Sequence, residues 1–311
     1  MPRVKIAQFI PAILSSLLFI SGCAKAPPYT KNFFLMDTFA SIEIVDELES
    51  AFRERLVEKV ISRMKKLERK FDYFSDDSEL SLINRLRKKD KLRISDEMFR
   101  VLKRSKALYA QTSGVFDVSL GSGKWRLDEY RKRIYFTESG VSIDLGGIAK
   151  GFIVDEGIAT LKKYGVRNAL INAGGDMYCM GDGPAGNGWK VGVRDPKDSN
   201  KIVEILTVRN KGIATSGGYE RFTETGGEKF SRIINPKTGL LVRDIYKSVT
   251  VVTGNCMTAD ALATAFYVYE PREAIAAAKR MTMVDCIIVD EAGGVHISGG
   301  FFQADLTNTV Q

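Results

Sequence analysis

The sequence predicts an α+β fold in which β-sheet cores are flanked by helices. Two long stretches carry apolar residues at helical spacing, and several short apolar runs have the length of strands. Their order along the chain is irregular, with no repeated strand–helix–strand unit, which argues against a doubly wound parallel sheet. With 311 residues, 44% hydrophobic and 27% charged, the chain can bury the core of one large or two small domains. This composition excludes intrinsically disordered, collagen-like and coiled-coil proteins.

The first 22 residues resemble a bacterial lipoprotein signal peptide rather than part of the fold. Arg3 and Lys5 precede an apolar run over residues 9–20, and small residues stand directly before Cys23. The run is too short to span a bilayer as a mature helix, and a short buried helix is the alternative interpretation. We expect acylated Cys23 to be the mature N-terminus, residues 23–31 to be a tether and residues 32–311 to fold. The protein would then be exported and lipid-anchored to a bacterial membrane, facing the periplasm or the cell exterior.

Apolar spacing and capping residues predict the elements of the folded domain in order. A strand over residues 33–45 is followed by an amphipathic helix over residues 49–70. A second helix begins at Ser95 or Asp96, which are good N-caps, and stops at Gly114. Helices also follow Gly147 and Thr258. Short strands are expected at residues 141–143, 169–172, 190–194, 203–208 and 248–252.

Charge and residue counts narrow the chemistry. The 46 Lys and Arg against 38 Asp and Glu give +8, an excess that we take to be spread along the chain without a dense basic run, so no nucleic-acid partner is expected. A Ser-His-Asp triad could use only His296, the single histidine. Cys179, Cys256 and Cys286 have no CxxC spacing and are expected to be small buried residues. Chemistry would therefore depend mainly on oxygen ligands, lysine and backbone amides.

One glycine-rich stretch, DLGGIAKG at residues 144–151, joins a short strand to a helix. Paired glycines let the backbone approach a neighbour closely, and a helix N-terminus presents unpaired N–H groups to an anion. Lys150 is expected one turn inside this helix, so a phosphate-bearing ligand would fit. Tight packing alone is the other explanation. The stretch has neither the spacing of a Walker A loop nor that of a GxGxxG motif.

Two further stretches carry acids. NAGGD at residues 172–176 ends an apolar strand, where polar residues can be aimed into a crevice, although taken singly a hairpin turn is the favoured interpretation. In TADALATA at residues 258–265, Asp260 and Thr264 lie four apart and share one helix face. A carboxylate and a hydroxyl so placed suit Mg²⁺. If the helix is considered alone, a structural explanation is about as good. In it, Asp260 is an acid favoured by the dipole near the helix start, and Thr264 bonds back to a helix carbonyl.

Together, these stretches resemble the ApbE family of FAD:protein FMN transferases, in the same order along nearly all of the mature chain. The resemblance is carried by MDT at 36–38, DSELS at 77–81 with Asn84, GVFDVS at 114–119, DLGGIAKG at 144–151, NAGGD at 172–176, TSGGYERF at 215–222, NPKTG at 235–239 and ADALATA at 259–265. Several linked motifs in one order are a specific signal. The resemblance implies an ApbE-like mixed fold.

The resemblance also implies an activity and a site. The family uses Mg²⁺ to transfer FMN from FAD to a threonine hydroxyl of a partner protein, with release of AMP. By similarity Asp260, Thr264 and the carbonyl of Gly147 would bind Mg²⁺, and Lys150 would contact FAD and offset phosphate charge. The residues that fall where the family binds flavin or adenine are Met36, Phe74, Val115, Phe116 and Asp117, and Asp176, Tyr219 and Glu220 are expected in the same pocket. Exported domains of flavin-bearing respiratory subunits are the acceptors that the family suggests.

The sequence departs from the family pattern at several positions. Arg232 stands where the family has a histidine suspected of deprotonating the acceptor threonine, and arginine stays protonated and cannot act as an ordinary general base. Either another group or water takes the proton, Arg232 acts on phosphate charge, or transfer is inefficient. Asp37 replaces a glycine, Phe74 replaces a tyrosine, and the insert at residues 120–142 is short. An Mg²⁺-dependent FAD pyrophosphatase and a non-catalytic FAD-binding lipoprotein, or simply a lipid-anchored scaffold, are therefore the alternatives.

Overall fold

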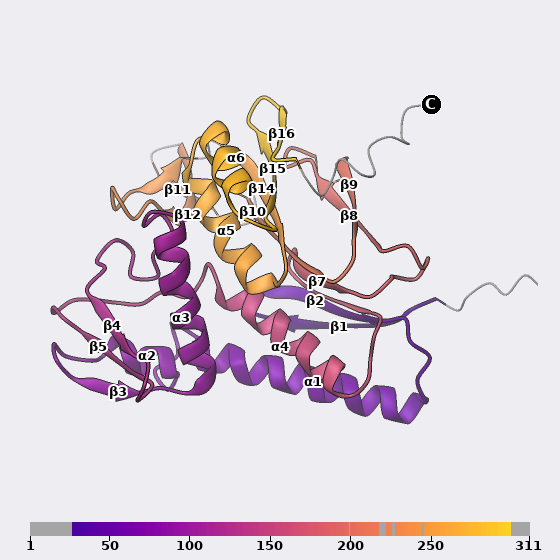
Figure 1. Ribbon diagram of the computed structural model, residues 1–311, viewed down its shortest axis with the longest axis horizontal. Helices are drawn as coiled ribbons and strands as arrows, with labels where there is room; N and C mark the ends of the chain where they lie inside the picture. Colours follow the sequence, from indigo (N-terminus) through magenta and orange to yellow (C-terminus); the bar gives the residue numbers. More distant parts are fainter. Residues whose placement is uncertain (1–26, 199, 218–221, 226–227, 244–245, 300–311) are drawn as a thin grey trace, which may run out of the picture.

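The computed structural model describes residues 27–198, 200–217, 222–225, 228–243 and 246–299, and shows the expected mixture of sheets flanked by helices (Figure 1). Its largest element is an eight-stranded sheet with the order β1-β2-β6-β7-β10-β14-β15-β16. Neighbouring strands in this sheet are antiparallel. The strands are β1 (Tyr29–Leu35), β2 (Thr38–Ile44), β6 (Ala169–Ala173), β7 (Asp176–Met180), β10 (Lys211–Gly217), β14 (Tyr246–Thr253), β15 (Asp285–Asp290) and β16 (Val295–Ile297).

Both faces of the main sheet are covered, because successive side chains of a strand point to opposite faces. On one face the main core forms with α1 (Ser50–Phe71), α4 (Ala149–Lys163), α5 (Cys256–Val268) and α6 (Pro271–Arg280). On the other face the hairpin of β8 (Trp189–Arg194) and β9 (Ile202–Val208) forms a second apolar cluster. Ile171 of β6 therefore lies in the first cluster and its neighbour Leu170 in the second.

Two smaller sheets flank this body. In one, β5 (Arg133–Phe136) lies between β3 (Lys91–Arg93) and β4 (Trp125–Asp128), beside α2 (Glu79–Asn84) and α3 (Asp96–Gln111). The other contains β11 (Phe222–Thr225), β12 (Glu228–Ile234) and β13 (Leu241–Arg243). None of the helices that the structure describes combines the length and apolarity needed to cross a membrane.

The long helices lie where apolar spacing predicted them. Ser95 caps α3 by accepting a hydrogen bond from Met98 N, and α3 ends before Gly114, whose φ of 81° lies in the left-handed region. The three described cysteines are free and buried, as expected, and burial raises the pKa of the Cys179 thiol to about 12. These thiols are therefore packing groups rather than nucleophiles at neutral pH.

Two predicted strands were wrong. Residues 33–45 form the β1–β2 hairpin instead of one strand, because Met36 and Asp37 turn the chain with φ of 50° and 57°. Aspartate tolerates such angles but methionine rarely adopts them, so the turn signal in the sequence is weak. Residues 141–143 belong to no strand. Instead, the Asn84 side chain donates to Ile143 O at 2.9 Å and accepts from Ile143 N at 2.8 Å, which replaces a neighbouring strand.

Candidate active site

The start of α4 packs against α5, and glycines make this approach possible. A Cβ atom on Gly147 would lie 2.9 Å from Thr264 Oγ1, and one on Gly151 would lie 2.3 Å from the carbonyl oxygen of Cys256. Neither distance leaves room for a side chain. Two glycines of the 144–151 stretch are thus needed to bring the Gly147 backbone beside Thr264.

Reciprocal capping fixes the two helices relative to each other. Asp260 of α5 accepts a hydrogen bond from Gly151 N in the first turn of α4, at 2.9 Å. Asp155 of α4 in turn accepts from Cys256 N and Met257 N, the first amides of α5, at 2.8 and 2.9 Å. The first N–H groups of a helix have no partner inside the helix, so each carboxylate satisfies donors that would otherwise be buried alone.

The NAGGD stretch at residues 172–176 reaches the junction of α4 and α5 through a hairpin. Gly174 and Gly175, with φ of 57° and 92°, form a two-residue turn that joins β6 to β7 and sets Ala173 opposite Asp176. The hairpin interpretation of NAGGD was therefore right. The Asp176 side chain is also buried at 1% exposure, and Lys150 Nζ lies 2.5 Å from its Oδ2. The β6–β7 turn therefore also positions the Asp176 carboxylate beside Lys150.

Three carboxylates gather at this junction. Asp155, Asp176 and Asp260 lie close enough to Cys256 to act on its thiol, as does Lys150, which is paired with Asp176. Burial raises the pKa of Asp260 to about 8, and the negative charge of Asp176 adds to the effect while Lys150 opposes it. Burial likewise raises the pKa of Asp155 to about 6, although the hydrogen bonds that it accepts from two backbone amides act to lower it. The negative charge of Asp176 beside Asp260 would favour a bound cation at this cluster.

The donor set at this cluster fits Mg²⁺, a hard cation that prefers oxygen ligands. Thr264 is only half-buried, whereas every other residue from 258 to 267 is buried, so the helix surface opens at the hydroxyl predicted to be a ligand. The Asp260 carboxylate lies one turn away on the same face, and the Gly147 backbone faces Thr264. Among the residues that the structure describes, no three His, Cys, Asp or Glu side chains are grouped to hold a metal, so backbone and hydroxyl oxygens would have to take part.

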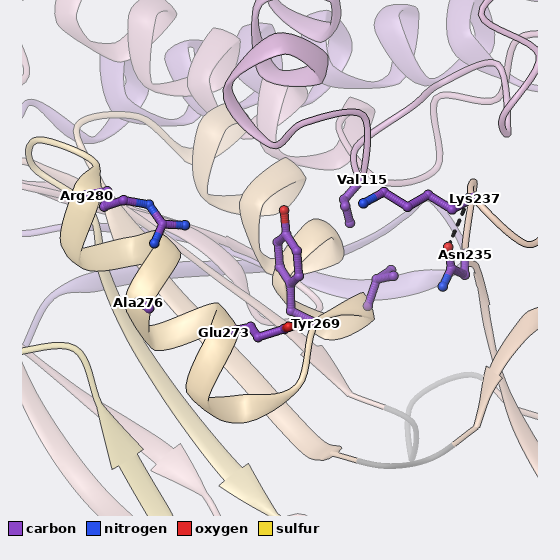
Figure 2. Close-up of a pocket in the computed structure, with 8 residues that line it drawn as sticks. Val115, Asn235, Lys237, Tyr269, Glu273, Ala276 and Arg280 are labelled. Carbon is purple, nitrogen blue, oxygen red and sulfur yellow. Dashed lines mark hydrogen bonds between the residues drawn. The ribbon is translucent and has the colours of Figure 1, made fainter.

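A cavity of about 480 Å³ lies at the C-terminal end of α5 and along α6 (Figure 2). Val268, one turn beyond Thr264, lines it together with Val115, Asn235, Lys237, Tyr269, Glu273, Ala276 and Arg280. Figure 2 shows the Tyr269 ring in the middle, with Val115 and Lys237 on one side and Arg280 on the other. The Tyr269 hydroxyl donates to Thr112 O at 2.8 Å, which holds the ring in place.

Sequence reasoning missed the cavity residues of α5 and α6. The spacing of four residues from Asp260 to Thr264 and on to Val268 could have indicated that Val268 lies on the same helix face. Sequence reasoning did single out both loops that meet here. A Cβ on Gly121, just after the GVFDVS stretch, would lie 2.3 Å from Pro236 O of NPKTG, so the two loops are in contact. Asn235 shapes its turn by accepting from Lys237 N at 2.9 Å, drawn as a dashed line in Figure 2.

The other predicted ligand-binding residues are placed differently. Val115 lines the cavity, but the Phe116 side chain lies in the main core at 4% exposure. The Asp117 carboxylate accepts from Ser119 N, Ser119 Oγ and Gly121 N within its own loop. This loop would therefore meet a ligand through Val115 and backbone atoms rather than through the other two side chains.

Met36 and Phe74 lie near the end of α1, and Met36 is partly buried against the main core. Met36 is in the β1–β2 turn, where its N–H donates to Glu68 of α1, and Phe74 follows α1 with 85% of its side chain exposed. Arg232 is in β12, but its side chain is not among the described ones. Cys23, Tyr219 and Glu220 lie outside the described residues. The residues that the fold brings together are thus Gly147, Lys150, Asp176, Asp260 and Thr264.

Comparisons with known proteins identify the family of this chain. The model of the ApbE family matches residues 36–124 and 121–288. A FAD:protein FMN transferase of Vibrio cholerae is 27% identical over 93% of this chain and 96% of its own length, and one of Treponema pallidum is 24% identical over 93% and 91%. A solved ApbE protein of Thermotoga maritima superimposes with a TM-score of 0.80 at 25% identity, over 87% of this chain and 97% of that one. A solved flavin transferase ApbE of Vibrio cholerae, at 22% identity and a TM-score of 0.74, covers 87% of this chain and 97% of its own and shares the fold. The matched segments contain every stretch that meets at the junction of α4, α5 and the β6–β7 turn, and the chain belongs to the ApbE family.

Proposed function

We propose that this protein transfers FMN from FAD to a threonine hydroxyl of a partner protein and releases AMP, in a reaction that requires Mg²⁺. The observation that carries the proposal is the meeting of three distant stretches around Lys150, Asp176 and Asp260, where an anionic substrate and a cation fit together. The names of the full-length relatives, FAD:protein FMN transferase, support the same reaction.

In this reaction the threonine oxygen bonds to the phosphorus of the FMN half, and the bond from that phosphorus to the oxygen bridging to AMP breaks. Catalysis of phosphoryl transfer comes mainly from positioning and from neutralising charge on the phosphoryl oxygens. Lys150, in the first turn of α4, supplies a positive charge beside the helix N-terminus. Asp176 holds that lysine in place from the β6–β7 turn.

Asp260, Thr264 and the Gly147 carbonyl would hold Mg²⁺, which when bound supplies positive charge to the phosphate oxygens. The cavity beyond Thr264 offers the flat Tyr269 ring for a planar base. Lys237 and Arg280 at its rim outnumber Glu273, so the cavity favours an anionic ligand. A phosphate-bearing dinucleotide therefore has a charged subsite and an aromatic subsite along α5.

A second candidate is an Mg²⁺-dependent FAD pyrophosphatase, in which water replaces the threonine. The observation that favours it is Arg232, because a permanent cation cannot take the proton from an acceptor hydroxyl. A chain that retains the FAD site but lacks this base would release FMN and AMP slowly to water. A non-catalytic FAD-binding lipoprotein would do neither.

One incubation separates the three. The purified chain is given FAD and Mg²⁺ with a threonine-bearing peptide, and in parallel with the same peptide carrying valine instead. Transferase activity yields AMP and a peptide heavier by the FMN group only with threonine. Equal release of free FMN with both peptides indicates the pyrophosphatase, and unchanged FAD in all samples contradicts both enzymatic proposals.

We also infer that the chain is exported and anchored through acylated Cys23. The charged start, short apolar run and small residues before this cysteine support the inference. An anchored enzyme of this kind would modify exported acceptors, such as flavin-bearing respiratory subunits.

A further inference from the structure

The positive charge of the chain is concentrated in one part of the fold, so the even spread expected from the sequence was wrong. Residues 85–133 contain fifteen Lys and Arg and six Asp and Glu, a net charge of +9, while the whole chain carries +8. The rest of the chain is therefore close to neutral. The charged segment forms α3, the β3-β5-β4 sheet and their connections.

Arginines face each other on the outer side of this small sheet. In the pairing of β3 with β5, Arg93 lies directly opposite Arg133, while Leu92 and Ile134 occupy the inner side. Like charges in directly opposed positions destabilise a sheet. Asp128 of β4 lies on the far side of Arg133, and its carboxylate accepts a hydrogen bond from Arg131 N. The fold thus tolerates an unfavourable arginine pair on an outward face.

The same arginines line a cavity of about 300 Å³ with Tyr130, Arg131 and Lys132. Lys132 is paired with Asp96 at 2.6 Å, whereas no carboxylate in the described part of the chain lies within ion-pair distance of Arg93, Arg131 or Arg133. Tyr130 is 95% exposed. The cavity is consequently lined by three arginines that make no ion pair in the described part of the chain, with Asp128 as the neighbouring carboxylate, and by an exposed aromatic ring.

We propose that this arginine face, defined as Arg93, Tyr130, Arg131, Lys132 and Arg133, binds the carboxylates of an acidic segment of a protein partner. Guanidinium groups bind carboxylates through paired hydrogen bonds, and arginine and tyrosine are enriched where protein interfaces are strongest. The inference does not depend on the proposed activity, because binding can be measured without FAD.

The position of the arginine face favours a protein over a membrane. In Figure 1 the β3-β5-β4 sheet lies at one end of the long axis, and the chain enters β1 from the other end. A lipid tether before Tyr29 would hold the opposite end of the molecule near the bilayer. The residues that line the cavity also include no Leu, Phe or Trp to insert among lipids.

Binding to a fluorescein-labelled peptide of ten glutamates, measured by fluorescence anisotropy at physiological salt, tests the proposal. We expect Arg93→Glu to weaken binding by about tenfold or more, because it reverses one charge of the face. It should also raise the urea midpoint of unfolding, because the substituted carboxylate would lie opposite Arg133 as an attractive pair. Lys66→Glu, an equal charge change on the exposed face of α1, should leave the affinity within about twofold. Arg131→Glu, in the β4–β5 turn, is the second variant should Arg93→Glu fail to fold.

Three results would overturn the proposal. The first is a wild-type protein that causes no anisotropy change with the acidic peptide. The second is an equal loss of affinity in Arg93→Glu and Lys66→Glu, which would mean a general charge effect. The third comes from a parallel measurement of binding to phosphatidylglycerol vesicles, in which all proteins have the same N-terminus. A loss of vesicle binding by Arg93→Glu that matches its loss of peptide binding would assign the face to lipid.

Discussion

Asp260 has two tasks at the candidate site. Its Oδ2 accepts from Gly151 N, and the same side chain is the predicted carboxylate ligand of a cation. The residue is 5% exposed, so replacing it with alanine would leave a buried N–H group without a partner. Asparagine keeps a carbonyl oxygen for Gly151 while removing the charge, and it separates the two tasks more cleanly.

We expect Asp260→Asn to abolish Mg²⁺-dependent turnover of FAD and to retain cooperative unfolding. Thr264→Val, which removes only a hydroxyl, should raise the Mg²⁺ concentration needed for half-maximal turnover by at least about tenfold. The matched control is Thr258→Val on the same helix, whose hydroxyl accepts a hydrogen bond from Arg104. Turnover with unchanged Mg²⁺ dependence in both site variants would remove these residues from the metal site.

Arg232 stands where the sequence resemblance leads us to expect a histidine. A general base typically contributes roughly 10²–10⁴-fold, and arginine cannot supply that contribution. We therefore expect slow transfer by the wild type and faster transfer by Arg232→His, with little change in FAD affinity, measured as AMP release and peptide mass. If Arg232→His and Arg232→Ala both reduce transfer strongly, the arginine acts on phosphate charge and the proton leaves by another route.

Reciprocal capping of α4 and α5 is the feature of the elements that positions the site. Asp155 and Asp260 each accept hydrogen bonds from N–H groups in the first turn of the other helix. A shift of either helix would therefore break hydrogen bonds at both helix starts. Gly151 allows no alternative spacing, because a Cβ there would lie 2.8 Å from Met257 Cα. The helices consequently hold Lys150, Asp260 and Thr264 at fixed separations before any substrate arrives.

The burial of the capping residue Asp155 predicts a pH dependence of stability. Burial raises the pKa of Asp155 from 3.8 to about 6. Between these values the folded state retains a proton that the unfolded state has lost, so the free energy of unfolding falls as the pH rises through this window, by on the order of 3 kcal/mol, and stays lower above it. We expect the stability of the wild type relative to Asp155→Asn to fall by this amount between pH 4 and pH 7. Urea unfolding of both proteins measures it, and a difference that does not vary with pH would contradict the assignment.

At the scale of the whole molecule, three regions are spread along the long axis. The chain enters β1 at one end, the junction of α4 and α5 lies between, and the β3-β5-β4 sheet with the arginine face lies at the other end (Figure 1). In an anchored protein this order would keep the candidate site and the arginine face on the side that a partner can reach.

Cys23→Ser tests the anchor. We expect the wild type to fractionate with membranes and to show an intact mass that corresponds to an acylated chain starting at Cys23. The variant should be released or remain unprocessed, because the thiol that carries the lipid is gone. An unmodified wild-type chain that starts at another residue would contradict the lipoprotein assignment.

The sequence by itself determined the local features of this protein. Apolar spacing placed α1, since a helix that buries one face repeats apolar residues at its own period, and capping residues placed α3. The helical spacing of four residues also placed Asp260 and Thr264 on one face, because that spacing is a property of the helix alone. The motif order was sufficient for the family, and the glycines of residues 144–151 were correctly identified as sites of close approach.

Only the tertiary structure decided which groups meet. Gly151 and Asp260 are separated by 109 positions, and no local pattern specifies that pairing. The β1–β2 turn at Met36, the support of Ile143 by Asn84 and the opposed arginines of β3 and β5 likewise depend on partners distant in sequence. Local propensity describes one segment in isolation, whereas these contacts are selected when apolar faces of many segments are buried together, which sets strand register and helix position at once.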